Sequence, residues 1–228
     1  MGIKSPNPMR TEASGLAYKG SQRQIQRYVQ EQPTKLNEAI INNIPSLAKL
    51  KPELSWVSPL ITEKYAEYSD QEFLKALGLA EKWPALNQFW PWGGPVWDAL
   101  AKVRWKGGEG VILLEAKSYP EECKSACQAG AKSLATIQAA IRQTQEFFSA
   151  SPTPAWLNDY YQLANRLAHL YFFRKVGINA WLVLLLFTND WKPTSQEQWE
   201  REFSNIWTRL GLPAKHEWIG QVFMEVSK

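Results

Sequence analysis

A short apolar run near the middle of the chain, Val111 to Leu114, leads directly into Glu115, Ala116 and Lys117. A short, continuous apolar run of this kind is typical of a strand that is buried on both faces. Because side chains alternate along a strand, positions 115 and 117 then point to the same face of the sheet. The fold must therefore bury this strand while compensating two charges on one of its faces.

A second strand is predicted just before this one, over Val96 to Arg104. The connection, residues 105–110, is rich in glycine, which supplies the backbone freedom that a hairpin needs. Pairing across the hairpin would bring Asp98 close to Glu115 and Lys117. Two carboxylates buried together repel each other unless a cation neutralises them, so this grouping indicates a divalent metal site.

The remaining predicted elements alternate between helices and strands. Helical segments show apolar residues every three or four positions, and strands are short apolar runs bounded by turn residues. Helices are predicted over 21–30, 34–44, 69–79, 133–148 and 153–173, and from Thr194 or Ser195 to Leu210, with further strands over 178–188 and 217–226. Segment 83–95, rich in Trp and Pro, is interpreted as a loop. This order predicts the α/β class, with a mixed central β-sheet flanked by helices.

Length and charge suggest one domain with a basic extension. The chain has 228 residues, 45% of them hydrophobic, which is enough for one sizeable core. Residues 1–30 carry five basic side chains against one acidic one, so we expect a flexible basic arm with a short helix over 1–30 and a single domain over 31–228. The arm either attracts a polyphosphate or only solubilises the terminus.

Several classes of location and site are disfavoured by the sequence. No apolar run approaches the roughly 20 residues needed to cross a bilayer, and the first residues lack a signal-peptide core, so we expect a cytoplasmic protein without a membrane partner. Cys123 and Cys127 are expected to be reduced thiols, because no second Cys pair or His cluster completes a zinc site. Phosphate-loop, nucleophile-elbow and dinucleotide motifs do not occur.

The segment Pro95-Val96-Trp97-Asp98, followed by Glu115-Ala116-Lys117, resembles the signature of the PD-(D/E)XK nuclease superfamily. The two acids are 17 residues apart, which suits this family, although Val96 and Trp97 separate the proline from the first acid. The resemblance covers roughly residues 34–188. It implies a restriction-endonuclease-like core, in which a helix, a three-stranded antiparallel unit, a helix and a further strand follow one another.

The resemblance also implies a chemistry. Asp98 and Glu115, with the backbone carbonyl of Ala116, would bind Mg²⁺ or Mn²⁺, and Lys117 would position the attacking water and help to deprotonate it. The implied activity is hydrolysis of phosphodiester bonds by an endonuclease, with DNA as substrate in preference to RNA. Each such centre cuts one strand, so a homodimer would suit a nuclease that cuts both.

Two further sets of residues are candidates. Many members of the superfamily carry another acid on the first core helix, and Glu38 lies in that region, although it could equally be a surface glutamate. In the helix predicted over 153–173, Gln162, Asn165, Arg166 and His169 share one face. Arg166 and Gln162 would either hold the scissile phosphate or satisfy buried backbone and a neighbouring acid. His169 is interpreted as a structural hydrogen-bonding residue.

Three other interpretations stay open. Glu115 and Lys117 could form a simple salt bridge, with Asp98 as an ordinary turn acid. The chain could be a non-catalytic nucleic-acid-binding or assembly protein that keeps the same fold. Because a fold does not fix a substrate, it could also be a phosphodiesterase for small nucleotides. Asn189 and Asp190, at the end of the strand over 178–188, are interpreted as a polar turn.

Overall fold

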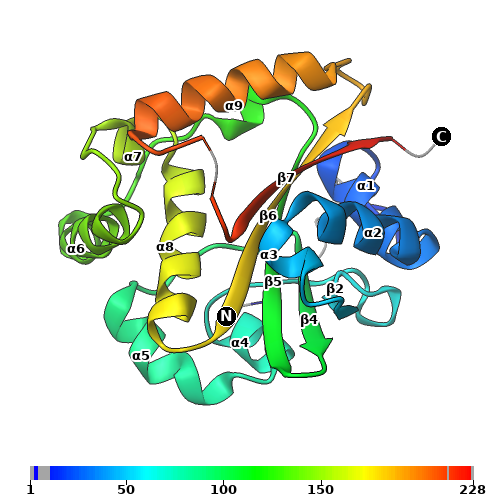
Figure 1. Cartoon of the computed structure of the whole chain (residues 1–228), viewed down its shortest axis with the longest axis horizontal. Coiled ribbons are helices and arrows are strands. Elements are labelled where there is room, and N and C mark those ends of the chain that lie inside the picture. The colour runs from blue at the N-terminus through cyan, green and yellow to red at the C-terminus, as the bar shows by residue number, and fades with distance from the viewer. Residues whose placement is uncertain (1–2, 5–10, 215, 227–228) are drawn as a thin grey trace.

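The computed structural model describes residues 3–4, 11–214 and 216–226. A mixed five-stranded sheet with the strand order β2-β4-β5-β6-β7 forms its centre, and helices flank both faces (Figure 1). The α/β class and the mixed sheet are therefore confirmed. The sheet strands are β2 (Glu53–Ser58), β4 (Ala99–Trp105), β5 (Gly108–Lys117), β6 (Asn179–Thr188) and β7 (Ile219–Glu225). Short strands β1 (Ile3–Lys4) and β3 (Glu67–Tyr68) pair separately.

The predicted hairpin is present, with β4 antiparallel to β5 and Ala99 opposite Leu114. Strand β2 adds to β4 in antiparallel fashion, whereas β5, β6 and β7 are parallel. The C-terminal ends of β5, β6 and β7 therefore lie at the same edge of the sheet. Ligands bind at that edge in open α/β sheets, so the register alone points to the end of β5.

The helices divide into two groups that cover opposite faces (Figure 1). One face is covered by α1 (Gly20–Glu31), α2 (Pro33–Asn43) and α3 (Pro45–Ala48). The other core contains α4 (Asp70–Leu77), α5 (Trp83–Phe89), α6 (Ala131–Phe147), α7 (Ala155–Asn158), α8 (Tyr161–Lys175) and α9 (Gln196–Leu210). Within the described residues, no helix combines the length and the apolar character that a membrane span requires.

Ser195 starts α9 as predicted. Its hydroxyl accepts from the backbone N–H of Gln198, whose side chain accepts in turn from the N–H of Ser195, so the two residues form a capping box. The predicted strands at 178–188 and 217–226 and the helix at 133–148 also occur, with ends shifted by at most two residues.

Three predicted boundaries were wrong. The strand expected from Val96 begins only at Ala99, so Asp98 precedes this strand instead of lying on it. Segment 83–95 was expected to be a loop, but α5 occupies its first half, because Pro84 lies in the first helical turn, where no backbone donor is needed, and Leu86 is buried. The expected single helix over 153–173 is instead α7 and α8. Between them the backbone of Ser125 bonds to Asp159 and Tyr161, and this pairing interrupts the helical ladder.

The described residues of the segment that was expected to be a flexible arm are packed against the rest of the protein. Part of it, residues 1–2 and 5–10, lies outside the described residues. Thr11 pairs with Ala17, and the N–H of Ala17 donates to Gln26 Oε1 at 2.7 Å. Helix α1 buries Ile25 and Tyr28 in the same core as α2, so the packed fold includes residues before position 31.

Candidate functional site

Asp98 and Glu115 come together because of the β4–β5 register. Asp98 lies in a bend directly before β4, one position beyond the pair formed by Ala99 and Leu114. Its Oδ2 accepts a hydrogen bond of 2.7 Å from the backbone N–H of Ala116. The turn therefore holds the Asp98 carboxylate against the end of β5, between the two charged residues of that strand.

Glu115 is neutralised on both of its oxygens. Oε1 lies 2.5 Å from Lys117 Nζ, and Oε2 lies 2.7 Å from Arg166 Nε. The side chains of Glu115 and Arg166 are each 5% exposed and that of Lys117 is 13% exposed, so these ion pairs are largely shielded from water. The salt bridge that the sequence allowed as an alternative is therefore present, and it is part of a network with Arg166.

Helix α8 provides the other side of this network. Arg166 Nη2 donates to the carbonyl of Val96 at 2.9 Å, and its guanidinium lies 5.1 Å from the ring centroid of Trp97. Gln162 Oε1 accepts from Lys117 Nζ at 3.0 Å. The observed contacts of Arg166 are thus those of a residue that satisfies buried backbone and a neighbouring acid, the second of its two predicted roles.

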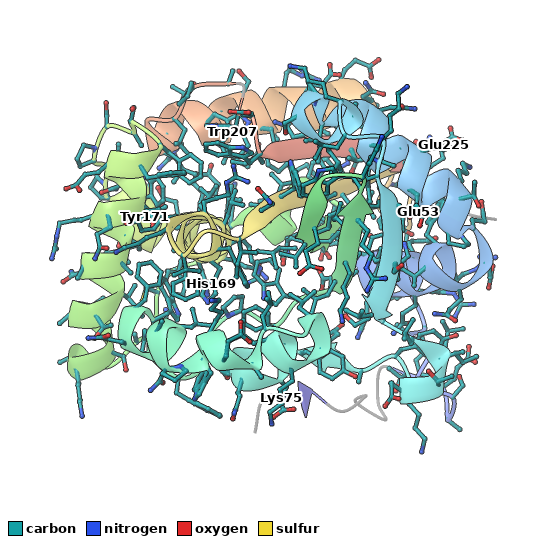
Figure 2. All side chains as sticks on the ribbon, turned by 60° about the horizontal axis from the view of Figure 1, so that its bottom comes forward. Glu53, Lys75, His169, Tyr171, Trp207 and Glu225 are labelled. Carbon is teal, nitrogen blue, oxygen red and sulfur yellow. The ribbon has the colours of Figure 1, made fainter. Side chains whose placement is uncertain are left out.

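His169 lies on the same helix but away from the charged residues. It is buried between α8 and the segment containing α4 and α5 (Figure 2), with the ring of Trp90 at 5.3 Å and its Nδ1 2.9 Å from the carbonyl of Asn165. Burial lowers the pKa of His169 to about 3. It is therefore neutral near pH 7, which suits the structural role expected for it.

The two acids titrate in opposite directions. Burial, and then the charge of Glu115, raise the pKa of Asp98 to about 8. Burial acts in the same direction on Glu115, but Arg166 and then Lys117 outweigh it and hold the pKa of Glu115 below its usual range. Burial would lower the pKa of Lys117, yet Glu115 and Asp98 raise it, so Lys117 is a cation at neutral pH. The unmet need for positive charge is at Asp98.

A cavity of about 480 Å³ opens beside these groups. It is lined by Asp98, Glu115, Lys117, Gln162 and Arg166, and by two acids that the sequence analysis did not select, Glu67 and Glu122. Ala116, the predicted carbonyl ligand, and Asn165, from the predicted polar helix face, also line this cavity, which is of a size typical for ligand sites.

Glu67 reaches the cavity through a strand that the sequence did not reveal. Tyr68 of β3 forms a bridge with Trp97, and this places Glu67 beside Asp98, whose pKa it helps to raise. Glu67 is buried, and its Oε1 accepts from Gln22 Nε2 of α1 at 2.8 Å. A two-residue strand has no periodicity that could have predicted this position.

Glu122 closes the end of β5. Its Oε2 accepts from the N–H of Ser118 at 2.6 Å, and burial raises its pKa. The Ser118 hydroxyl donates to Asp190 Oδ2 at 2.5 Å, and Asp190 Oδ1 accepts from the N–H of Trp191 at 2.8 Å. Asp190 thus forms the polar turn that the sequence predicted and also ties that turn to the strand next to Lys117.

The structure does not bring Glu38 to the site. Leu36 and Ile40 point into the core between α2 and the sheet, and Glu38, two positions from each, lies on the exposed side of the helix. Two residues along a helix correspond to about 200° of rotation, which carries the side chain to the opposite face. Glu67, from a different element, occupies the position next to Asp98.

Asp98 and Glu115 are the carboxylates that the sequence predicted as ligands of a divalent cation at this cavity. Within the described ranges, no group of three or more Asp, Glu, His or Cys side chains is arranged to hold a metal ion. Mg²⁺, however, is commonly bound by one or two carboxylates, with water and phosphate oxygens completing its shell. Asp98 and Glu115, together with the carbonyl of Ala116, match that donor chemistry. Burial and the charge of Glu115 raise the pKa of Asp98, and a cation bound beside it would offset both effects.

Comparisons with known proteins add no relative to this picture, because no protein-family model, curated protein or solved structure matches the chain.

Proposed function

We propose that the protein is a metal-dependent nuclease that hydrolyses phosphodiester bonds at Asp98, Glu115 and Lys117. The observation that carries this proposal is the convergence of these three side chains at one cavity, beside the end of a buried strand. The pKa values of Asp98 and Glu115 shift in opposite directions within one cleft, a pattern that marks candidate functional sites.

The topology supports the proposal. The antiparallel unit β2-β4-β5, followed by helices and the parallel strand β6, has the order that the PD-(D/E)XK resemblance implies. The acids come from the turn before the second strand of that unit and from the end of the third, and helix α8 supplies polar side chains next to them. We therefore interpret the core as restriction-endonuclease-like.

Each residue has a role that follows from its contacts. Asp98, Glu115 and the Ala116 carbonyl would hold Mg²⁺ or Mn²⁺, which when bound polarises a phosphate oxygen and stabilises negative charge in the transition state. Lys117 is a cation, so it can donate to the phosphate or to the attacking water. Lys117 can accept a proton from that water only after its ammonium group has released one, and neutralising Glu115 would favour that release by lowering the pKa of Lys117. Gln162, already bonded to Lys117, would orient its ammonium group.

Glu67 is the acid that best replaces Glu38 in this scheme. It lines the same cavity as Asp98, whereas Glu38 is exposed on α2. Carboxylates beyond the first metal-bound pair commonly hold further water molecules around the cation. We propose that Glu67 has this supporting role.

The wider assignments rest on the resemblance alone. We propose DNA as the polymer, endonucleolytic cleavage as the mode and the cytoplasm as the compartment. Cys123 and Cys127 are both free thiols, which suits a reducing compartment. A homodimer, which would carry two such centres, is proposed on the same ground.

A non-catalytic role is the second candidate, because both oxygens of Glu115 are paired with cations. If Arg166 and Lys117 hold Glu115 permanently, the network serves stability, and the cavity would bind nucleic acid without cutting it. A chain of this kind would bind no divalent cation at Asp98.

Cleavage assays separate the two candidates. Labelled double-stranded DNA, single-stranded DNA and RNA would be incubated with Mg²⁺, Mn²⁺ or EDTA, using the wild type, Lys117→Ala and Asp98→Ala. We expect metal-dependent cutting that falls at least about 100-fold in both variants. Glu38→Gln is the matched control, since it removes an acid outside the cavity, and it should cut at the wild-type rate.

Equal activity in the wild type and Asp98→Ala would contradict the proposed centre and indicate a contaminating nuclease. A wild type that cuts no polymer and binds no divalent cation would favour the non-catalytic role. Circular dichroism of each variant would establish that the loss of cutting is not a loss of folding.

A further inference from the structure

A second, larger cavity of about 630 Å³ adjoins the reacting groups. Asp98 and Lys117 form part of its lining, and so do two exposed aromatic residues, Tyr18 and Trp191, with exposed fractions of 55% and 48%. Exposed aromatic rings in a cavity wall offer faces on which a flat ligand can stack. The cavity beside the proposed active site thus presents flat apolar surface.

Trp191 is held in a defined position. Its ring meets Tyr119 edge to face, with the centroids 5.4 Å apart. Its backbone N–H donates to Asp190, which accepts in turn from Ser118, the residue that follows Lys117. The indole is thereby fixed to the end of β5, so its position relative to Lys117 does not depend on a free loop.

Two lysines accompany the rings. Lys19 Nζ lies 4.5 Å from the ring centroid of Trp191, and Lys192 Nζ lies 4.1 Å from that of Tyr119. Both lysines are exposed and have flexible side chains, so each could leave its ring and bind an anion nearby. A ligand that combines a flat aromatic group with negative charge would match both features, and a nucleotide is such a ligand.

We propose that Trp191 stacks on an unpaired base while Lys19 and Lys192 bind the adjoining phosphates, so that the substrate is single-stranded DNA. This inference rests on the proposed nuclease function. In a duplex the base faces are covered by their neighbours, and an indole cannot reach them without unstacking. A single strand exposes these faces, and its flexible backbone can enter a cavity in which Glu115 and Lys117 are only 5% and 13% exposed.

The chain contains a matched control residue. Trp92 is 54% exposed and also packs edge to face against another aromatic ring, that of Trp83, at 5.4 Å. It is not among the residues that line the larger cavity. Trp92→Ala therefore removes the same side chain with a similar exposure and packing geometry, but away from the proposed site.

The test measures binding and cleavage separately. Fluorescence anisotropy of a labelled single-stranded oligodeoxynucleotide, and of the corresponding duplex, would be measured in EDTA for the wild type, Trp191→Ala, Trp191→Phe and Trp92→Ala. We expect the wild type to prefer the single strand and Trp191→Ala to bind it about tenfold more weakly. Trp191→Phe should retain most of the affinity, and Trp92→Ala all of it.

Wild-type protein that binds no single strand, or that binds the duplex at least as tightly, would overturn the inference. Unchanged binding by Trp191→Ala would do the same. Cleavage rates in Mn²⁺ then separate this inference from the proposed function. Loss of binding in Trp191→Ala, with no cutting by any protein, supports the stacking site and contradicts the nuclease. Metal-dependent cutting of single strands at equal rates by the wild type and Trp191→Ala would support the nuclease and contradict the stacking site.

Discussion

On one face of β5, Ile112, Leu114 and Ala116 pack against the core covered by α1–α3, whereas on the other face the apolar residues give way to Glu115 and Lys117. The two faces belong to the same strand and are both buried. The apolar face needs only shape complementarity, but the charged face also needs Arg166 and Gln162 from α8. The charged face therefore depends on specific partners, so the loss of a partner should affect it differently from a truncation on the apolar face.

Removing Arg166 should have the largest effect. Arg166→Ala leaves Glu115 with one cationic partner and removes the Arg166 donor from the Val96 carbonyl, so we expect a loss of about 3–5 kcal/mol in the free energy of unfolding. Urea unfolding would measure it. Arg142→Ala, an exposed arginine on α6, should change stability by less than about 0.5 kcal/mol. Equal effects of the two substitutions would show that the network contributes little.

A truncation on the apolar face should cost slightly less. Leu114 is fully buried, and Leu114→Ala should reduce the free energy of unfolding by about 2–5 kcal/mol through lost burial and a cavity. Unlike the changes on the charged face, it should leave the pH dependence of stability unchanged. Urea titrations at several pH values would show this, and an altered pH dependence would contradict the separation of the two faces.

Asp98 should make metal-free stability depend on pH. Its pKa of about 8 in the folded protein exceeds the value near 4 in an unfolded chain, so the folded state keeps a proton that the unfolded state releases. The free energy of unfolding should therefore fall as pH rises from about 4 to about 8, by at most about 1.4 kcal/mol per pH unit. Asp98→Asn should reduce this slope and Glu38→Gln should not. An unchanged slope in Asp98→Asn would place the titration elsewhere.

The smallest effect is expected at Gln162. Gln162→Leu removes a single acceptor from Lys117, which keeps its ion pair with Glu115, so stability should fall by about 1 kcal/mol. If Gln162 orients the ammonium group, the same substitution should also lower the cleavage rate by more than the loss of folded protein accounts for. A proportional loss of both, measured by urea unfolding and cleavage assays, would assign it a purely structural role.

The sequence predicted the sheet and the convergence of Asp98, Glu115 and Lys117, because strand alternation and a glycine-rich hairpin are local signals. It did not predict Glu67. That residue reaches the site through an isolated bridge between Tyr68 and Trp97, which is a contact between distant segments. Glu38 was selected by analogy with a family position, and the orientation of α2 places it on the exposed side.

The sequence predicted which polar residues of α8 lie together on one face, but it did not predict their roles. Helical spacing placed Gln162 and Arg166 on one face, yet it could not decide whether Arg166 meets a phosphate or Glu115. That choice depends on the distance between α8 and β5, which tertiary packing determines. The exposed position of Trp191 was not predicted, because a tryptophan in a turn gives no sequence signal of its exposure.

Divalent-cation binding at Asp98 is the central claim, and calorimetric titration with Mn²⁺ tests it most directly. The wild type and Glu38→Gln should bind the cation, and Asp98→Asn should lose that binding while retaining its fold by circular dichroism. An absence of binding by the wild type, or equal binding by Asp98→Asn, would contradict the metal centre proposed here.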